Sequence, residues 1–500
     1  MEAFAQDKAL PSCAELLAAM AAGRLSSLQL TDVCLARIKA IDKGGPKINS
    51  IIEINPEARD IARKLDAERK AGKLRGDLHG LPVLLKDNIA TGDKMQTTAG
   101  SLALAGLHAA RDAQVVARLR EAGAVILGKT NLSEWANIRS TRSTSGWSAR
   151  GGLTRNPYAL DRNTSGSSSG TAAAIAADLA PLGVGTETDG SVVSPASICG
   201  LVGLKPTVGR VSRDGIIPIS HTQDTAGPMT RSVAECALLF GAMQGRDARD
   251  TITGTSPNWR PWAPVPDVLR GKRIGVARNY FTGYDEADAL IETSLQRLRE
   301  LGAVLVDPIE LPAVGYGDAE LQVLLYELKA DLELWLADFA PQARVKNLAD
   351  VIAFNRAHAK EEMPWFAQEL FERAQALGGL DSAAYKEALA LCAKGARVDG
   401  LDHAFDTHEL DAIVAPTGGL AWLTDPIASD HYGASFSTPA AVAGYPHLTV
   451  PAGLVRGLPL GLSFVGRRWT EAHLLAYGHA FEQATKARRA PTFLRNTRLL

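Results

Sequence analysis

Two serine-rich tracts and one lysine carry the residue types that acyl-transfer chemistry needs. The first tract runs from Ser165 to Gly170 and the second from Gly185 to Ser191, and Lys86 precedes both. A serine hydroxyl attacks an amide carbonyl when a neighbouring base takes its proton, and a neutral lysine can be that base. The pattern predicts a serine hydrolase with a lysine base, which would work without a metal or a cofactor.

Lys86 follows a short apolar run, residues 81–85, which we expect to be a buried strand. As a base it must be neutral near pH 7, so its pKa must fall by roughly three units from about 10.4. Burial lowers the pKa of a lysine, whereas nearby carboxylates raise it. Asp87 is adjacent, but side chains alternate along a strand, so it should face the other way. A lone lysine at a strand end more often extends to solvent, so its role depends on the serine tracts.

The residues just before Ser191 predict a site for an oxyanion. Thr188, Asp189 and Gly190 follow a predicted strand and precede Pro195. A tight turn there can direct consecutive backbone N–H groups into one cavity, and loss of one such donor typically costs about 3–4 kcal/mol of transition-state stabilisation. A carboxylate beside an oxyanion is unfavourable, so the Asp189 side chain is expected to point away.

Two familiar motifs give alternatives. Residues 123–130 match the P-loop spacing G-x-x-x-x-G-K-[ST], but their central Ala-Val-Ile-Leu is typical of a strand and not of a phosphate-binding loop. Residues 166–170 match G-x-S-x-G, the nucleophile elbow, but the preceding segment is polar and contains a proline where an apolar strand is required. A P-loop ATPase and an α/β-hydrolase using Ser168 with His447 therefore stay as minor alternatives.

Alternating helical and strand patterns predict an α/β fold with a central sheet covered by helices on both faces. Helices are expected over residues 12–23, 27–41, 56–72, 112–122 and 171–180, and strands over 48–54, 81–85, 124–127, 182–185, 201–204, 274–277, 304–306, 412–414, 448–450 and 460–465. We expect one domain over residues 1–500: an N-terminal helical region (1–72), a core with the motifs (73–230), a helical insertion (318–408) and a return to the sheet (411–490). The insertion would either cap the site or simply cover the sheet.

Composition limits the remaining classes of function. The 500 residues carry a formal net charge of -1, which gives no basic field for nucleic acid. Five scattered cysteines without a Cys-x-x-Cys pair are typical of a reducing compartment and not of a disulfide framework or a structural zinc site. The acidic N-terminus does not resemble a signal peptide, and no long apolar run is present. We expect a cytoplasmic protein without a membrane or nucleic-acid partner, although the odd thiol count leaves export open.

Together these motifs resemble the amidase signature family, whose members hydrolyse amides with a Ser-Ser-Lys set. The resemblance covers nearly the whole chain and includes residues 199–207, 223–228, 411–416 and 443–451. Within the family, residues 186–191, 212–220 and 145–148 are most similar to the bacterial peptide amidase branch. The resemblance implies the family's fold, a large mixed sheet covered by helices with a helical insertion.

The resemblance also assigns roles to the residues. It implies Ser191 as nucleophile, Ser167 as a bridging serine after a cis peptide bond, and Lys86 as base. The oxyanion donors would be the backbone N–H groups of Thr188, Asp189, Gly190 and Ser191, and Ser168 and Asp224 would support the site.

The chain departs from the family pattern at two positions. Ser169 replaces a glycine of the usual Gly-Gly-Ser-Ser-Gly-Gly, and Val193 replaces an arginine found in many members. Asp224 thereby lacks the expected cationic partner, which weakens the interpretation as part of a glutamine amidotransferase.

The expected reaction is hydrolysis of a carboxamide to an acid and ammonia, with water and a small or short-peptide amide as reactants and a monomer or homodimer as the enzyme. The C-terminal amide of a peptide is the favoured substrate. The alternatives are aryl or aliphatic acylamides, carbamates and a role within an amidotransferase complex. Four aromatic residues could line a substrate cleft, although core packing is the commoner role: Trp147, Trp422, Tyr432 and Phe436.

Overall fold

The computed structural model describes residues 9–259, 262–312 and 316–497. Eleven strands form one mixed sheet in the order β1-β3-β2-β6-β8-β7-β12-β13-β11-β9-β10. Their bounds are Ile51–Ile54 (β1), Pro82–Lys86 (β2), Val125–Thr130 (β3), Leu182–Glu187 (β6), Val202–Lys205 (β7), Thr225–Thr230 (β8), Arg273–Ala277 (β9), Val304–Ile309 (β10), Ala412–Pro416 (β11), His447–Val455 (β12) and Leu458–Val465 (β13). A separate hairpin joins Trp147–Ser148 (β4) to Gly152–Leu153 (β5).

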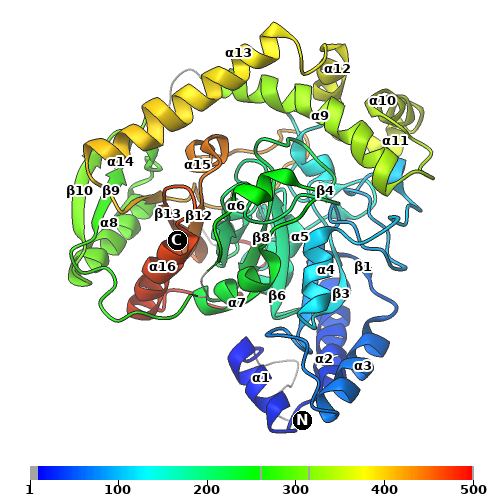
Figure 1. Ribbon diagram of the computed structural model, residues 1–500, viewed down its shortest axis with the longest axis horizontal. Coiled ribbons are helices and arrows are strands. Elements are labelled where there is room, and N and C mark those ends of the chain that lie inside the picture. The colour runs from blue at the N-terminus through cyan, green and yellow to red at the C-terminus, as the bar shows by residue number, and fades with distance from the viewer. Residues whose placement is uncertain (1–8, 260–261, 313–315, 498–500) are drawn as a thin grey trace.

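Helices flank this sheet, which confirms the predicted fold class (Figure 1). In the first half of the chain they are Cys13–Ala21 (α1), Ser27–Arg37 (α2), Ala58–Lys70 (α3), Gln114–Glu121 (α4), Ser169–Ala176 (α5), Val193–Ile198 (α6) and Val233–Met243 (α7). The second half contributes Asp285–Glu300 (α8), Gly317–Phe339 (α9), Leu348–Ala357 (α10), Ala359–Glu362 (α11), Glu369–Ala376 (α12), Ala383–Cys392 (α13), His403–Thr407 (α14), Thr438–Ala443 (α15) and Glu471–Thr485 (α16).

The chain between β10 and β11 is helical, and α9 and α13 lie side by side along one edge of the molecule (Figure 1). Residues 393–402 form a π-helix that links α13 to α14. Apolar side chains of these helices, among them Tyr326 and Phe405, pack with Ile413 of β11 and Phe436 in a second core cluster. This packing attaches the helical region to the sheet.

The site-bearing strands lie in the middle of the sheet. β2 pairs in parallel with β3 and β6, and β6 pairs antiparallel with β8. The carboxyl ends of β2 and β6 therefore meet at one edge, where Lys86 ends β2 and Glu187 ends β6. This register brings the two motifs, about a hundred residues apart in sequence, into contact.

Helix α5 is buried on every side, as an Ala-rich helix apolar all round should be. It ends at Ala176 and not at the predicted residue 180, because Asp178 adopts a left-handed φ of 56° and forms an ion pair with Arg231 at 2.9 Å. Gly170 lets the helix approach the sheet closely, since a Cβ there would lie 2.4 Å from the backbone oxygens of Asn131 and Ser50.

The P-loop alternative does not fit the structure. Residues 125–130 form β3 in the sheet, with both neighbours paired. Lys129 is fully buried, and its Nζ donates to Ile89 O at 2.7 Å and to Thr97 Oγ1 at 3.1 Å. Its backbone and its ammonium group are therefore committed to structure.

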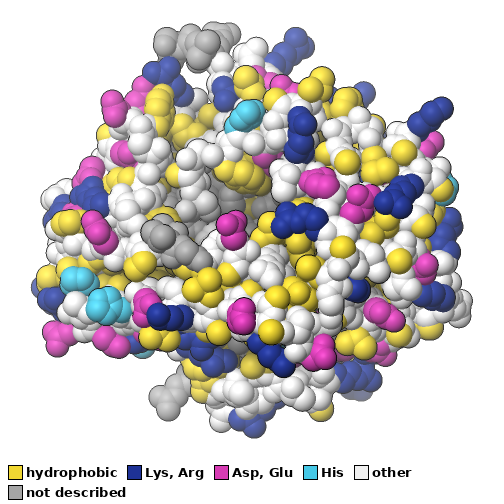
Figure 2. Space-filling view, turned by 90° about the horizontal axis from the view of Figure 1, so that it is seen from above, with side chains coloured by type: hydrophobic (Ala, Val, Ile, Leu, Met, Phe, Trp, Pro, Cys, Tyr) yellow, Lys and Arg dark blue, Asp and Glu magenta, His cyan; other side chains and the backbone are white. Residues whose placement is uncertain are grey.

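None of the helices in the described ranges is long and apolar enough to cross a membrane. Basic and acidic side chains are interspersed over the face that Figure 2 shows, as the near-zero net charge predicts. All five cysteines are buried free thiols.

Candidate active site

Lys86, Ser167 and Ser191 form one hydrogen-bonded chain. Lys86 Nζ lies 2.7 Å from Ser167 Oγ, and Ser167 Oγ lies 2.9 Å from Ser191 Oγ. The Gly166–Ser167 peptide bond is cis, as the family resemblance implies. The structure therefore brings together the three residues that the sequence singled out.

The Lys86 amine is held among neutral oxygens. Its side chain is fully buried, and besides Ser167 it contacts Thr186 O at 3.2 Å and Thr186 Oγ1 at 2.9 Å. A neutral amine can donate two hydrogen bonds and accept one, so three partners satisfy it. Burial lowers the pKa of Lys86 from 10.5 to about 7, against the charges of Asp224 and Glu187, which raise it. Asp87 faces away, toward Thr98 and Arg150, as the strand alternation predicted.

The turn before Ser191 presents unused backbone donors. Within the described part of the chain, the N–H groups of residues 188–191 donate to no acceptor. Gly190 has a φ of 75°, a left-handed conformation that glycine adopts without strain. The Asp189 carboxylate points away from this turn, because its Oδ2 accepts a hydrogen bond from Thr438 Oγ1 at 2.6 Å. The arrangement is one that can hold an oxyanion beside Ser191.

Ser168 and Asp224 take supporting positions. Ser168 Oγ donates to Thr186 O at 3.1 Å, and Ser168 N donates to Ser191 O at 3.2 Å. Asp224 accepts from Thr188 Oγ1 at 2.5 Å and from the N–H groups of Ile219 and Ser220 at 2.8 and 2.9 Å. Burial raises the pKa of Asp224 to about 6, and these hydrogen bonds oppose the rise. Hydrogen-bond donors thus occupy the place of a cation beside this carboxylate.

The elbow alternative with Ser168 and His447 is wrong in its geometry. His447 lies in β12, where its Nε2 is 2.6 Å from Ser463 Oγ. Burial and the charge of Lys205 lower its pKa to about 3. Ser168 uses its hydroxyl on Thr186, so no histidine acts on it in this structure.

Two residues of the second tract matter more than the sequence suggested. Thr186 supplies two of the three oxygens around Lys86 Nζ, and Asn88 Nδ2 donates to the same hydroxyl at 2.9 Å. Glu187 Oε2 accepts from the N–H groups of Val192 and Val193 at 2.8 and 3.0 Å, which fixes the backbone directly after Ser191. Their signal in the sequence was only their place at the end of a strand.

The four aromatic candidates divide between core and surface. Trp147 and Phe436 are buried, in ring contacts with Phe366 and His447. Trp422 and Tyr432 are in contact, 4.6 Å between ring centroids, and line a small cavity together with Ser194. The Tyr432 ring is half exposed while its hydroxyl lies 2.9 Å from Ser145 Oγ.

Helix α9 reaches the site through the segment before β8. Gln223 Nε2 donates to Thr188 O at 3.3 Å and to Glu320 Oε1 of α9 at 2.9 Å. A cavity of about 270 Å³ between α9 and this segment is lined by residues that include Asp224 and His221. The helical region thus contacts the loop that supports the nucleophile turn.

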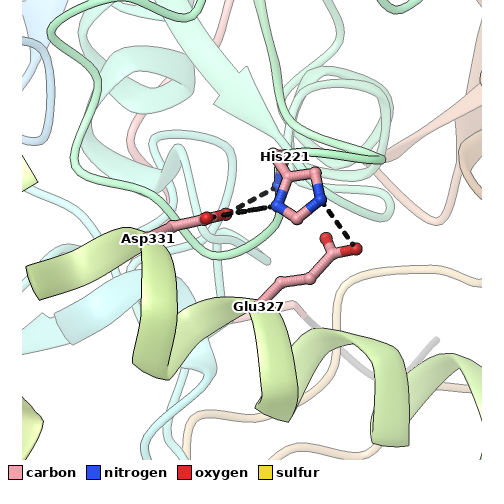
Figure 3. Close-up of side chains that lie close together, drawn as sticks. All are labelled: His221, Glu327 and Asp331. Carbon is pink, nitrogen blue, oxygen red and sulfur yellow. Dashed lines mark hydrogen bonds and ion pairs between the residues drawn. The ribbon is translucent and has the colours of Figure 1, made fainter. Parts of the chain in front are cut away.

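A cluster beside this cavity, His221, Glu327 and Asp331, has the residue types of a metal site. Figure 3 shows the two carboxylates at opposite edges of the imidazole ring, with Asp331 2.9 Å from Nδ1 and Glu327 3.4 Å from Nε2. A metal bound to one ring nitrogen would have only one carboxylate on its side. Burial disfavours the imidazolium, but the hydrogen bond and charge of Asp331 and the charge of Glu327 raise the pKa of His221 above 6.5. The cluster therefore suits a proton shared with two carboxylates.

Comparisons with known proteins agree with this site. The amidase family model matches residues 29–475. A probable amidase from Arabidopsis thaliana is 40% identical over 94% of this chain and 89% of its own length. The A-type component of the glutamyl-tRNA(Gln) amidotransferase from Halorhodospira halophila is 37% identical, over 94% of this chain and 96% of its own.

Among solved structures, native peptide amidase from Stenotrophomonas maltophilia is 52% identical, with a TM-score of 0.93 over 98% of this chain and 99% of that chain. The family match extends over most of the chain, and the structural match over nearly all of it. The chain belongs to the amidase family and is a hydrolase of amide carbon–nitrogen bonds.

Proposed function

We propose that this enzyme hydrolyses the C-terminal carboxamide of peptides to the peptide acid and ammonia, with Ser191 as the nucleophile. The observation that carries the chemistry is the chain Lys86 Nζ–Ser167 Oγ–Ser191 Oγ, with distances of 2.7 and 2.9 Å, around a fully buried lysine. The 52% identity to a peptide amidase over nearly the whole chain supports the substrate class.

The reaction follows from the hydrogen bonds. Neutral Lys86 accepts the Ser167 proton while Ser167 accepts the Ser191 proton, and Ser191 Oγ bonds to the amide carbon. The carbonyl oxygen becomes an oxyanion held by the N–H groups of Thr188, Asp189, Gly190 and Ser191. The proton then returns through Ser167 to the nitrogen, the carbon–nitrogen bond breaks and ammonia leaves. Water repeats the same steps on the Ser191 ester and releases the acid.

A substrate panel tests the proposal. We expect the purified chain to convert an N-blocked dipeptide amide to the free acid, with the internal peptide bond intact by mass spectrometry. Faster turnover of an acyl-anilide or a carbamate would contradict the peptide amide assignment but keep the amidase site. The same panel run with and without ATP also tests the P-loop alternative, which would require a nucleotide effect.

The amidotransferase relative suggests a second function, as one component of such a complex. The geometry gives it less support, because Val193 stands where many members have arginine and Asp224 is held by Thr188 and backbone N–H groups. Copurification with partner proteins, combined with no activity of the isolated chain, would favour it over the peptide amidase proposal.

A further inference from the structure

A second cavity, of about 600 Å³, lies between the helical region and the core. Its walls come from α9, the end of α13 with the π-helix, α15 and the segments around residues 208–223, and none of Lys86, Ser167 and Ser191 lines it. The volume is in the usual range for small-molecule sites. Its walls are mostly apolar, with Val208, Ile252, Val323, Leu389 and Val442 among the lining residues.

The described side chains that line this cavity include cations but no carboxylate: Arg213, His221, Arg397 and Arg468. Arg213 is paired with Asp250, which accepts from its Nε at 2.9 Å, and His221 is paired with Asp331 at 2.9 Å. Their charges are therefore balanced inside the protein.

Arg397 and Arg468 differ from these two. Neither guanidinium forms a hydrogen bond or an ion pair with any residue of the described ranges, and Arg397 Nε is buried without a partner. Arg468 contacts the ring of Trp469, 4.6 Å from its centroid. Burial and the neighbouring charge of Arg397 both lower the pKa of Arg468, so the two cations repel each other. Unbalanced neighbouring charges of one sign cost free energy, which an anion between them would recover.

The backbone that carries Arg397 is also unusual. Residues 393–402 form a π-helix, and Cys392, Ala393 and Arg397 from this stretch line the cavity. π-Helices are rare and are frequent at functional sites, because the extra residue per turn redirects side chains. This is a feature of the backbone and is independent of the charges.

We infer that this cavity binds an organic carboxylate with a short apolar body. The carboxylate would lie between Arg397 and Arg468, because guanidinium groups bind carboxylates in a planar two-point fashion. The apolar body would lie against the aliphatic wall, which includes Val323 and Leu389. This site is separate from the Ser191 chemistry and does not depend on the proposed function.

Calorimetric titration of the full chain with sodium hexanoate tests the inference, with hexan-1-ol as a neutral probe of the same length. We expect hexanoate to bind, hexan-1-ol to bind much more weakly, and the double variant Arg397→Gln/Arg468→Gln to lose at least about tenfold in hexanoate affinity. Arg467→Gln is the matched control, since Arg467 neighbours Arg468 in sequence but pairs with Asp406 and does not line the cavity.

The melting temperature shows whether the double variant folds. Without ligand we expect it to equal or exceed that of the parent chain, because the substitutions remove two repelling charges. Hexanoate should raise the melting temperature of the parent chain and of Arg467→Gln only. No hexanoate binding, equal binding of hexan-1-ol, or unchanged hexanoate affinity in a folded double variant would overturn the inference.

Discussion

Complete burial of an amine among neutral oxygens is the feature that makes Lys86 suited to act as a base. Its three partners, Ser167 Oγ and two oxygens of Thr186, satisfy the neutral form, and no carboxylate of the described residues is hydrogen-bonded to it. Because burial sets the direction, the pKa of Lys86 falls to about 7 although Asp224 and Glu187 oppose the fall. Both serines are thus linked to a base that is neutral in part of its population near pH 7.

The pH dependence of kcat/KM should follow this pKa. A base must be unprotonated, so kcat/KM is expected to rise with pH through a pKa of about 7 and then level off. A profile measured with an N-blocked dipeptide amide from about pH 5 to 9 checks this. A kcat/KM that is flat across this range, or that falls as pH rises, would contradict Lys86 as the base.

Single substitutions in the hydrogen-bonded chain should remove turnover. We expect Ser191→Ala and Lys86→Met each to lower kcat by at least about 10⁴-fold, since members of such a unit fail together. Ser169→Ala is the matched control, because Ser169 lies in the same tract but donates to Ser165 O at 2.7 Å. Circular dichroism and a melting curve confirm folding, and substantial activity in a folded Ser191→Ala would rule out the assignment.

At the scale of elements, the register of β2 against β6 places Lys86 beside the second tract. Most strand positions were predicted from apolar runs, but β8 was missed. It contains Gly227 and Pro228, residues that argue against a central strand, and Pro228 nevertheless pairs with Val184. Likewise the Thr186 contact with Lys86 could not be predicted, because it depends on which strands are neighbours and not on any local pattern.

Glu187 should act as a positioning residue for the turn after Ser191. Glu187→Ala removes the acceptor for Val192 N and Val193 N, so we expect kcat to fall at least about tenfold with a smaller change in KM. Glu187→Gln keeps one acceptor oxygen and should restore part of kcat. If both variants lose stability equally while kcat of the folded fraction is unchanged, the role is only structural.

At the scale of the whole molecule, the helical region is joined to the catalytic core through charged groups. Glu327 accepts from Thr222 N at 3.2 Å and from Tyr385 OH at 2.7 Å, so one carboxylate links α9, α13 and the segment before β8. The sequence predicted a helical insertion but left open whether it capped the site. Its contacts with residues 220–223 arise from side chains distant in sequence, which no periodicity reveals.

His221 should make this junction pH-dependent. A pKa raised in the folded state contributes stability below about pH 6.5, the unfolded value, and that contribution is lost as pH rises through the folded value. His221→Gln should therefore lower the melting temperature at about pH 5.5, by an amount of the order of 1 °C, and have little effect at about pH 8.5. His473→Gln, at an exposed histidine, is the control. A deficit that is the same at both pH values would contradict the account.

The central claim is that Ser191 carries the acyl group. The most direct measurement is acid quenching of the enzyme during turnover of an N-blocked dipeptide amide, followed by proteolysis and mass spectrometry of the serine-containing peptides. The account predicts an acyl adduct on Ser191 in the parent chain and none in Ser191→Ala. An adduct on Ser168, or on any residue other than Ser191, would contradict it.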